Sequence, residues 1–381
     1  MKQNVYFMAL GGGQKVGASC YYLRLGDRNL ILDAGSGYKD GLVFEPNLHA
    51  LLTSPFLYSM NQIDQIYISH AHMDHIGYLL KLMQCARESH VYMTELTAVL
   101  AEYQLYDKKY LHKAASDEEA RLAAQNLLEK VAKVCYHRTL DFGSYRVTFF
   151  PAGHIPGAMM MLFEVGKKKI LYTGDYSLER TALTNGCSLP EGVDIDVLIL
   201  CGLHANHPDY QKRCDSLFKT AKCALRTVLE RKQPICCCVS QLSKGIEFLR
   251  TLQEWNTDHV PIYLDVQMMG IVEKMERLSI PLMDENTKLF TGEVPREAHI
   301  LITTQKGTEG NYYKIPVKFS LHEDFSEMQE FIRRVNPKTA ILVHCEKRKN
   351  EWDDTIEQII MRDSNCRTQF IFAEESELYQ L

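Results

Sequence analysis

The fold is decided by one stretch of the sequence: Ile66-Tyr67-Ile68-Ser69-His70-Ala71-His72-Met73-Asp74-His75-Ile76-Gly77. An apolar strand ends in this stretch, and three histidines and one aspartate follow before an expected helix over residues 77–85. His70 and His72 alternate, so both imidazoles can project to one side of the strand end. Asp74 and His75 come next on the turn and can reach a neighbouring point. Imidazole and carboxylate are ligands for zinc and related ions. The pattern therefore predicts a metal site rather than a solvated loop with chance histidines.

Four further polar residues stand where a predicted strand stops, which is where α/β folds place their chemistry. His154, Asp175 and His344 each follow an apolar run, and Asp33 does so near the start of the chain. Taken singly, each is explained equally well as a buried polar group or a turn former. Their shared position at strand ends favours one common site.

The composition is that of a folded globular protein. Hydrophobic residues make up 46% and charged residues 24% of the 381-residue chain, which excludes a disordered or fibrous protein. The net charge of −5 gives no overall attraction to nucleic acid, so a polyanion must be met by a local basic patch. No apolar run approaches the roughly 18 residues that a membrane-spanning helix needs. The start of the chain also lacks the apolar core of a signal peptide.

The cysteines indicate a reducing compartment. The chain has 12 cysteines, which is too dilute for a disulfide scaffold. Cys236, Cys237 and Cys238 lie side by side in an apolar run and are expected to act as small hydrophobic residues of a buried strand. We therefore expect a cytoplasmic protein with no membrane contact.

The order of the expected elements indicates one α/β domain interrupted by a smaller one. Roughly the first 200 residues combine short strands with helices expected over residues 95–106 and 117–134. From about residue 208, helix and strand alternate, which is typical of a small α/β unit with a parallel sheet. The expected division is a main domain over residues 1–207, an insertion over residues 208–318 and a closing part over residues 319–381.

The whole pattern resembles the metallo-β-lactamase superfamily and, within it, the β-CASP nucleic-acid hydrolases of the RNA-processing type. The superfamily resemblance rests on the histidine-rich cluster at residues 70–75, on Gly153-His154, on Gly174-Asp175, and on Asp33 near the metal loop. It implies a four-layer αββα sandwich interrupted by a small α/β insertion.

Two later segments, and the glycine-rich opening at residues 11–20, are similar to the β-CASP branch in particular. Residues 319–324 match motif B, Ser-x-His-x-Asp, with His322 at its centre. Residues 341–346 match motif C with His344. The family resemblance therefore covers nearly the whole chain.

The resemblance implies two metal ions, zinc or alternatively manganese or iron, with the following ligands: His70, His72 and His154 at one ion, Asp74, His75 and His344 at the other, and Asp175 bridging them. A hydroxide bound by both ions would attack phosphorus, which makes Asp74 essential to catalysis. His322 would be the general acid that protonates the leaving sugar oxygen, unless it is a surface histidine that caps the next helix. Lys347, Arg348 and Lys349 would contact substrate phosphates, unless they form a solvated helix face.

The sequence departs from the β-CASP pattern at several positions. Motif A normally ends a strand with an acidic residue, but Cys201 occupies that place. The carboxylate that would orient His322 is therefore missing, and His204, His207 or Asp209 are the candidates to replace it. The insertion is also short for the family, Lys15 replaces a glutamate of the opening motif, and Cys345 replaces a glycine of motif C.

Three classes of function remain open. The first is a nuclease that cuts single-stranded RNA or, less in keeping with the motifs, DNA. The second is a catalytically weak subunit that binds nucleic acid or a protein; the full set of candidate ligands counts against it. The third is a hydrolase of a small molecule such as a cyclic phosphodiester, lactone or thioester, for which His322 has no role. An oxygen-reducing di-iron site is disfavoured because the redox branch usually has glutamate at the position of His72.

Overall fold

The protein is described here from a computed structural model, which describes residues 4–105, 117–189, 192–210, 216–304, 312–346, 355–362 and 368–381. The chain divides into two compact units. The main unit contains residues 1–179, 186–211 and 322–381, and the inserted unit contains residues 180–185 and 212–321. The mixed α/β class with an insertion that the sequence predicted is confirmed.

The main unit contains two seven-stranded sheets. The first sheet has, in spatial order, the strands β21 (Leu378–Gln380), β1 (Val5–Gly11), β2 (Cys20–Leu25), β3 (Arg28–Leu32), β6 (Gln65–Tyr67), β7 (His90–Thr94) and β8 (Ala132–Val134). The second has β20 (Gln369–Phe372), β19 (Thr339–Val343), β13 (Val197–Cys201), β12 (Lys168–Tyr172), β11 (Met159–Val165), β10 (Arg146–Pro151) and β9 (Thr139–Asp141). A small hairpin, β4 (Gly37–Lys39) with β5 (Leu42–Phe44), stands apart from both sheets.

The core of the main unit lies between the two sheets. Fully buried apolar side chains from both sheets form one cluster, including Phe7 and Leu23 from the first and Phe163 and Ile199 from the second. This packing removes a large apolar area from water, which is the main favourable contribution to folding. The hydroxyls of Tyr67 and Tyr145 meet at 2.7 Å within the same buried layer, so even the polar atoms there are satisfied.

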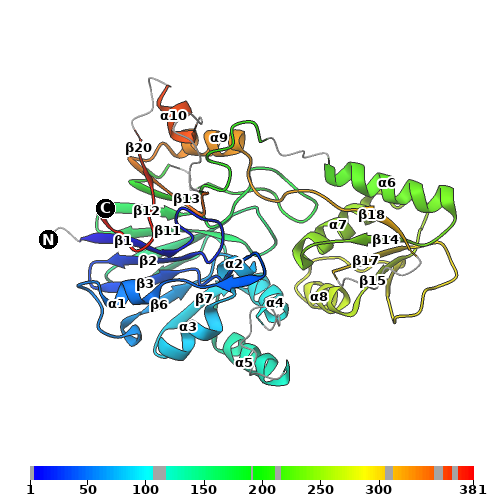
Figure 1. Cartoon of the computed structure of the whole chain (residues 1–381), viewed down its shortest axis with the longest axis horizontal. Helices are drawn as coiled ribbons and strands as arrows, with labels where there is room; N and C mark the ends of the chain where they lie inside the picture. The colour runs from blue at the N-terminus through cyan, green and yellow to red at the C-terminus, as the bar shows by residue number, and fades with distance from the viewer. Residues whose placement is uncertain are drawn as a thin grey trace. The chain divides into compact units, whose positions relative to one another are not determined.

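Helices cover the outer faces of the two sheets. Figure 1 shows α1 (Leu48–Leu52) and α3 (Leu79–Cys85) outside the first sheet, and α9 (Phe325–Val335) and α10 (Ile356–Met361) outside the second. The main unit therefore has the layer order helix, sheet, sheet, helix. Its other helices are η1 (Met60–Gln62), α2 (Met73–Ile76), α4 (Glu95–Gln104) and α5 (Asp117–Lys130).

Parallel pairing brings several strand ends together in each sheet. In the first sheet, β3, β6, β7 and β8 run parallel to one another. In the second sheet, β12, β13, β19 and β20 do the same. Because the carboxyl ends of parallel strands meet at one edge of a sheet, the loops that follow these strands converge. These loops carry most of the candidate site residues.

The inserted unit has a five-stranded sheet in which every pair is parallel, as the alternation of elements predicted. Its strands are, in spatial order, β16 (Thr287–Leu289), β15 (Ile262–Leu264), β17 (Ile300–Thr303), β14 (Ile235–Cys238) and β18 (Tyr313–Pro316). Its helices are α6 (Ser216–Arg231), α7 (Leu242–Trp255) and α8 (Val266–Arg277). Cys236 and Cys237 are buried in β14 and Cys238 is half-buried. Every cysteine that the structure describes is a free thiol.

Two expected helices differ from the observed ones. The helix expected over residues 117–134 ends at Lys130, and Ala132–Val134 forms β8 at the edge of the first sheet. Val131 and Val134 fit a helical period, but pairing with β7 decides the conformation of this short segment. The helix expected over residues 77–85 begins only at Leu79, because a separate short helix, α2, already contains Asp74 and His75. Among the described helices, none combines the length and the apolar character that crossing a bilayer requires.

Candidate metal centre

The main unit brings all seven candidate metal ligands together in two adjacent groups. One group consists of His70, His72, His154 and Asp175, and the other of Asp74, His75 and His344. Within each group, one ligand atom of every residue lies within 4.8 Å of the others. The residues come from the loop after β6 together with α2, and from the loops after β10, β12 and β19, so four separate segments of the chain build the site.

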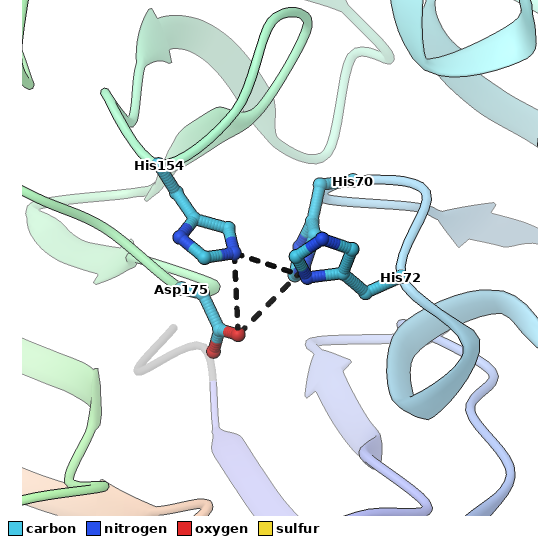
Figure 2. Close-up of side chains that lie close together, drawn as sticks. All are labelled: His70, His72, His154 and Asp175. Atoms are coloured by element: carbon cyan, nitrogen blue, oxygen red, sulfur yellow. Dashed lines mark hydrogen bonds and ion pairs between the residues drawn. The ribbon is translucent and has the colours of Figure 1, made fainter. Parts of the chain in front are cut away.

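The first group is a buried cluster of three imidazoles and one carboxylate (Figure 2). Nε2 of His154 lies 3.1 Å from Nδ1 of His72. Oδ2 of Asp175 lies 3.6 Å from Nε2 of His70 and 3.8 Å from Nε2 of His154. The atoms that converge are therefore those that carry lone pairs in a neutral imidazole and an ionised carboxylate, as a cation requires.

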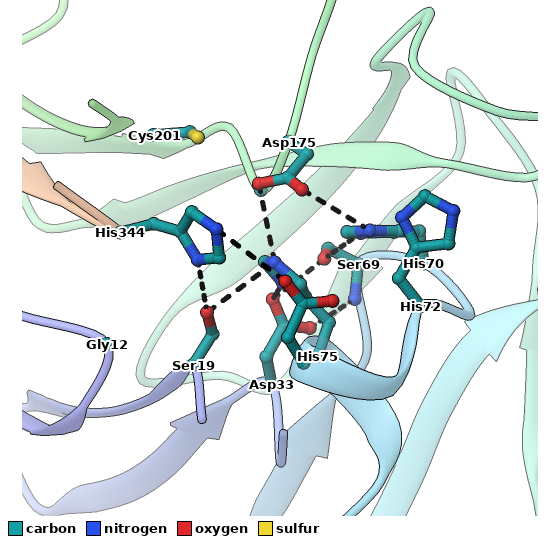
Figure 3. Close-up of polar contacts among 12 residues, drawn as sticks. Gly12, Ser19, Asp33, Ser69, His70, His72, His75, Asp175, Cys201 and His344 are labelled. Carbon is teal, nitrogen blue, oxygen red and sulfur yellow. Dashed lines mark hydrogen bonds and ion pairs between the residues drawn. The ribbon is translucent and has the colours of Figure 1, made fainter. Parts of the chain in front are cut away.

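The second group is joined to the first through Asp175 (Figure 3). Oδ1 of Asp175 lies 3.3 Å from Nε2 of His75, while its Oδ2 faces the first group. Nε2 of His344 lies 3.6 Å from Oδ2 of Asp74. One carboxylate thus presents one oxygen to each group, which is the arrangement that a bridging ligand needs.

The hydrogen bonds of these residues test whether a metal fits. Among the described residues, Nε2 of His70 and both carboxylate oxygens of Asp175 are buried and make no hydrogen bond of good geometry beside the ion-pair contacts given above. An unsatisfied buried polar group costs about 1–3 kcal/mol, and more when it is charged. Coordination of a cation would satisfy all three atoms, and the nitrogen and oxygen donors suit zinc and its neighbours. The residues therefore fit a metal centre.

Asp33 orients His75 directly and His70 through Ser69. Its carboxylate accepts hydrogen bonds from Nδ1 of His75 at 2.7 Å, from the backbone N–H of Ser69 at 2.6 Å and from the Ser69 hydroxyl at 2.7 Å. The hydroxyl of Tyr172 donates to the same carboxylate. Since the Ser69 hydroxyl donates to Asp33, its oxygen accepts from Nδ1–H of His70, 3.0 Å away. Both imidazoles are then protonated on Nδ1 and direct Nε2 towards Asp175.

Charge in the centre is distributed unevenly. Burial lowers the pKa of His70 well below its ordinary value, and the neighbouring His75 adds to this effect, so His70 is neutral as a ligand must be. Burial also opposes charge on His75, but Asp175 and Asp33 outweigh it and hold the pKa of His75 well above its ordinary value. Burial would raise the pKa of Asp175, yet the surrounding His75, His322 and His344 hold it well below the usual range. The centre therefore keeps an ionised carboxylate.

His322 lies at the edge of the centre rather than on the surface. Its Nδ1 is 3.5 Å from Oδ2 of Asp175, and its ring centroid is 4.3 Å from that of His154. Burial lowers the pKa of His322 well below its ordinary value, and the neighbouring His154 contributes in the same direction. The interpretation of His322 as a cap of the next helix is wrong, because Asp324 caps α9 and forms a capping box with Glu327.

Cys201 is the last residue of β13 and is buried. Burial raises the pKa of its thiol well above the ordinary value, and the charges of Asp175 and Glu323 add to this effect. The thiol is therefore kept neutral next to the carboxylate that joins the two groups.

Two of the residues that could replace the missing motif A carboxylate, His204 and His207, contact other side chains. His204 stacks on Tyr210 with ring centroids 3.8 Å apart, and burial lowers the pKa of His204 to about 4. Nε2 of His207 lies 3.6 Å from Oε2 of Glu346.

Lys15, at the position of the family's glutamate, forms an ion pair of 2.7 Å with Glu375. Lys347, Arg348 and Lys349 lie outside the described residues.

Sequence reasoning missed the hydroxyl groups that orient the histidines. Ser69 stands directly before His70, and Tyr172 ends the strand that precedes Asp175, so both were within the motifs already selected. Ser19, whose hydroxyl lies 2.9 Å from Nδ1 of His344, belongs to the glycine-rich opening. The available signal was a hydroxyl residue within a selected motif, such as Ser69 beside His70.

Comparison with known proteins agrees with this geometry. Residues 13–218, more than half of the 381-residue chain, match the family described as "Metallo-beta-lactamase superfamily". Residues 314–352 match a family described as "Zn-dependent metallo-hydrolase RNA specificity domain". A solved structure, a protein of unknown function from Enterococcus faecalis, shares the fold with a TM-score of 0.66 at 12% identity, covering 99% of this chain and all of the other.

Curated relatives are RNA-processing proteins. "Endoribonuclease YSH1" of Gibberella zeae is 28% identical over 77% of this chain and 35% of its own length. "Cleavage and polyadenylation specificity factor subunit 3" of Dictyostelium discoideum is 28% identical over 73% of this chain and 36% of its own length. The chain thus spans about a third of the length of these relatives. The matches confirm the predicted resemblance to the RNA-processing β-CASP type, and the chain belongs to the metallo-β-lactamase superfamily.

Proposed function

We propose that the chain is a metal-dependent nuclease that hydrolyses phosphodiester bonds of single-stranded RNA. The observation that carries this proposal is the position of His322, an imidazole 3.5 Å from a carboxylate that faces both groups of candidate ligands. A hydrolase of lactones or thioesters has no need of such an imidazole. The names of the relatives and the RNA-specificity match support RNA as the substrate.

We propose that the seven candidate ligands hold two ions, which are zinc or alternatively manganese or iron. The first ion would be held by His70, His72 and His154, the second by Asp74, His75 and His344, and Asp175 would contribute to both. Two such ions would supply Lewis-acid stabilisation of the phosphoryl oxygens and a water whose pKa is lowered to about 7. Asp33 contributes by keeping the proton of His75 on Nδ1, which leaves Nε2 free to coordinate.

His322 supplies the proton in this scheme. A sugar alkoxide is a poor leaving group, so its oxygen must be protonated as the bond to phosphorus breaks. In the cationic imidazole, Nδ1–H faces Asp175 and Nε2–H is available for the leaving oxygen. Burial holds the pKa of His322 well below its ordinary value, although the ionised Asp175 opposes this effect, so the cation is the less populated form and gives up its proton readily. Phosphate contacts are proposed for Lys347, Arg348 and Lys349, which directly follow motif C.

We retain residues 1–207 and 319–381 as the catalytic domain, with residues 208–318 as the insertion. A cytoplasmic location is likewise retained as a proposal. It is based on the free thiols of the described cysteines.

One experiment tests the proposed function directly. End-labelled single-stranded RNA and a DNA of the same sequence are incubated with the purified chain and Zn²⁺ or Mn²⁺, and products are resolved by length. We expect cleavage of the RNA that is abolished by a chelator and weakened by salt, since phosphate contacts release counterions. Cleavage of a lactone or thioester with neither nucleic acid cut would instead establish a small-molecule hydrolase.

A further inference from the structure

Ser19 makes a buried contact with the candidate ligand from motif C. Its hydroxyl oxygen lies 2.9 Å from Nδ1 of His344, and the residue is fully buried. The backbone of Ser19 is fixed on both sides, since its N–H donates to the carbonyl of Asp74 at 2.8 Å and its carbonyl accepts from the N–H of Gly35 at 2.8 Å. Figure 3 shows the Ser19 hydroxyl joined by dashed lines to both His75 and His344. The hydroxyl is therefore held at a defined point of the second group.

A second hydroxyl determines which way the Ser19 bond runs. The phenol of Tyr21 donates to the carbonyl of Gly12 at 3.0 Å. Burial raises the pKa of the Tyr21 phenol, and the Ser19 hydroxyl beside it acts in the opposite direction, as a donor to the phenol oxygen does. A carbonyl can only accept, so Tyr21 donates to Gly12 and its oxygen is available to accept from Ser19. The Ser19 oxygen is then left to accept from Nδ1–H of His344. The chain of bonds has one direction, from His344 through Ser19 and Tyr21 to Gly12.

Gly12 provides the space in which these hydroxyls meet. A Cβ at this position would lie 2.7 Å from the Tyr21 hydroxyl oxygen and 3.1 Å from the Ser19 hydroxyl oxygen, and the backbone φ of +65° disfavours any other residue. The Gly12 carbonyl also accepts the backbone N–H of His344 at 2.6 Å. His344 itself has a left-handed backbone with φ of 52°. One carbonyl thus fixes the backbone of His344 directly and its ring through the two hydroxyls.

We propose that Ser19 and Tyr21 are positioning residues that keep the proton of His344 on Nδ1, so that Nε2 presents its lone pair beside Asp74 to a metal ion. The inference rests on the proposed metal centre. Nε2 of His75 is the other imidazole nitrogen near Ser19, but at 3.5 Å it is the more distant partner. His75 and His70 receive the same Nδ1–H orientation from Asp33 and Ser69. Among the described residues, the Asp33 carboxylate accepts from Ser69, His75 and Tyr172 and not from His344, for which the two hydroxyls perform the equivalent task.

The test uses Tyr21→Phe and Ser19→Ala, each with a matched control elsewhere in the main unit. Tyr22→Phe removes a buried phenol that donates to Asn29, and Ser89→Ala removes a buried hydroxyl that donates to the carbonyl of Ile63. Two properties of the full chain are measured. The first is the tautomer of His344 in metal-free protein, from long-range ¹H–¹⁵N couplings of the imidazole. The second is zinc affinity, from competition with a chromophoric chelator.

We expect wild-type His344 to carry its proton on Nδ1. In Tyr21→Phe the Ser19 hydroxyl is free to donate to Nδ1, so the tautomer with the proton on Nε2 should gain population. Zinc affinity should fall about 10- to 100-fold in Ser19→Ala, the usual effect of removing a group that orients a metal ligand. A smaller fall is expected in Tyr21→Phe, and none in the two controls.

Two outcomes overturn the inference and are distinguishable. If wild type binds zinc while both variants keep its tautomer and affinity, the hydroxyls do not position His344 although the metal centre stands. If wild type binds no zinc, the metal centre itself fails. If Ser19→Ala does not fold, Tyr21→Phe tests the inference by itself, because that substitution removes one oxygen atom and leaves the ring in place.

Discussion

Replacement of His322 by alanine separates proton donation from metal binding. The His322 side chain is 21% exposed, and it approaches the centre with Nδ1 3.5 Å from Asp175 and its ring beside that of His154. It belongs to neither group of candidate ligands, so the variant should retain its metal. If His322 protonates the leaving oxygen, RNA cleavage should slow by roughly 10²–10⁴-fold. That range corresponds to about 3–5 kcal/mol of lost transition-state stabilisation.

The choice of substrate makes this prediction specific. A nitrophenyl phosphodiester has a leaving group that needs no proton, so its hydrolysis should be nearly unaffected in His322→Ala. The assay is kcat/KM on one RNA and one nitrophenyl substrate, with metal content measured in parallel. His49→Ala, which alters an exposed histidine on α1, is the control. Equal loss on both substrates would refute proton donation and show that His322 binds or positions the substrate instead.

Three further predictions concern Asp74, Cys201 and Glu247. Asp74→Ala should abolish most hydrolysis with little change in melting temperature, because Asp74 is only half-buried; an active variant would show that the second ion is dispensable. Cys201 should resist iodoacetamide at pH 8 while exposed Cys223 reacts, since burial and acidic neighbours raise the pKa of the Cys201 thiol. Modification of folded protein is followed by peptide mapping with mass spectrometry, and a Cys201 modified as fast as Cys223 would contradict this. Burial raises the pKa of Glu247 in α7 from 4.5 to about 7, so the folded state binds this proton more tightly than the unfolded state does. The free energy of unfolding should therefore decline as pH rises from 4.5 to 7, by about 3 kcal/mol at most. Chemical denaturation across this pH range should show that Glu247→Gln reduces the decline, and an equal decline in both proteins would reject the assignment.

The candidate ligand set could be selected from the sequence because its residues follow the ends of apolar strands, with Asp74 and His75 in the short helix α2 directly after one of them. Strand ends are readable from local pattern, and parallel pairing then brings them to one edge. Asp175 is a clear example, since Lys168–Tyr172 is a strand and the turn after it places the carboxylate between the two groups. The parallel sheet of the inserted unit followed from the alternation of its elements in the same way.

Other features depend on contacts that local pattern does not contain. The strand at Ala132–Val134 exists because it pairs with β7, whereas its apolar spacing also fits the end of a helix. The bond from Ser19 to His344 joins residues 325 positions apart, and nothing near Ser19 distinguishes it from any other serine of a glycine-rich loop. His322 could be selected from its motif, but its burial beside His154 depends on how the segment before α9 packs.

The metal content of the purified chain tests the central claim most directly. Protein prepared without chelator is analysed for zinc, manganese and iron, before and after dialysis against Zn²⁺. Seven converging ligands with one shared carboxylate predict about two metal equivalents per chain. A content near zero that does not rise on dialysis would contradict the account.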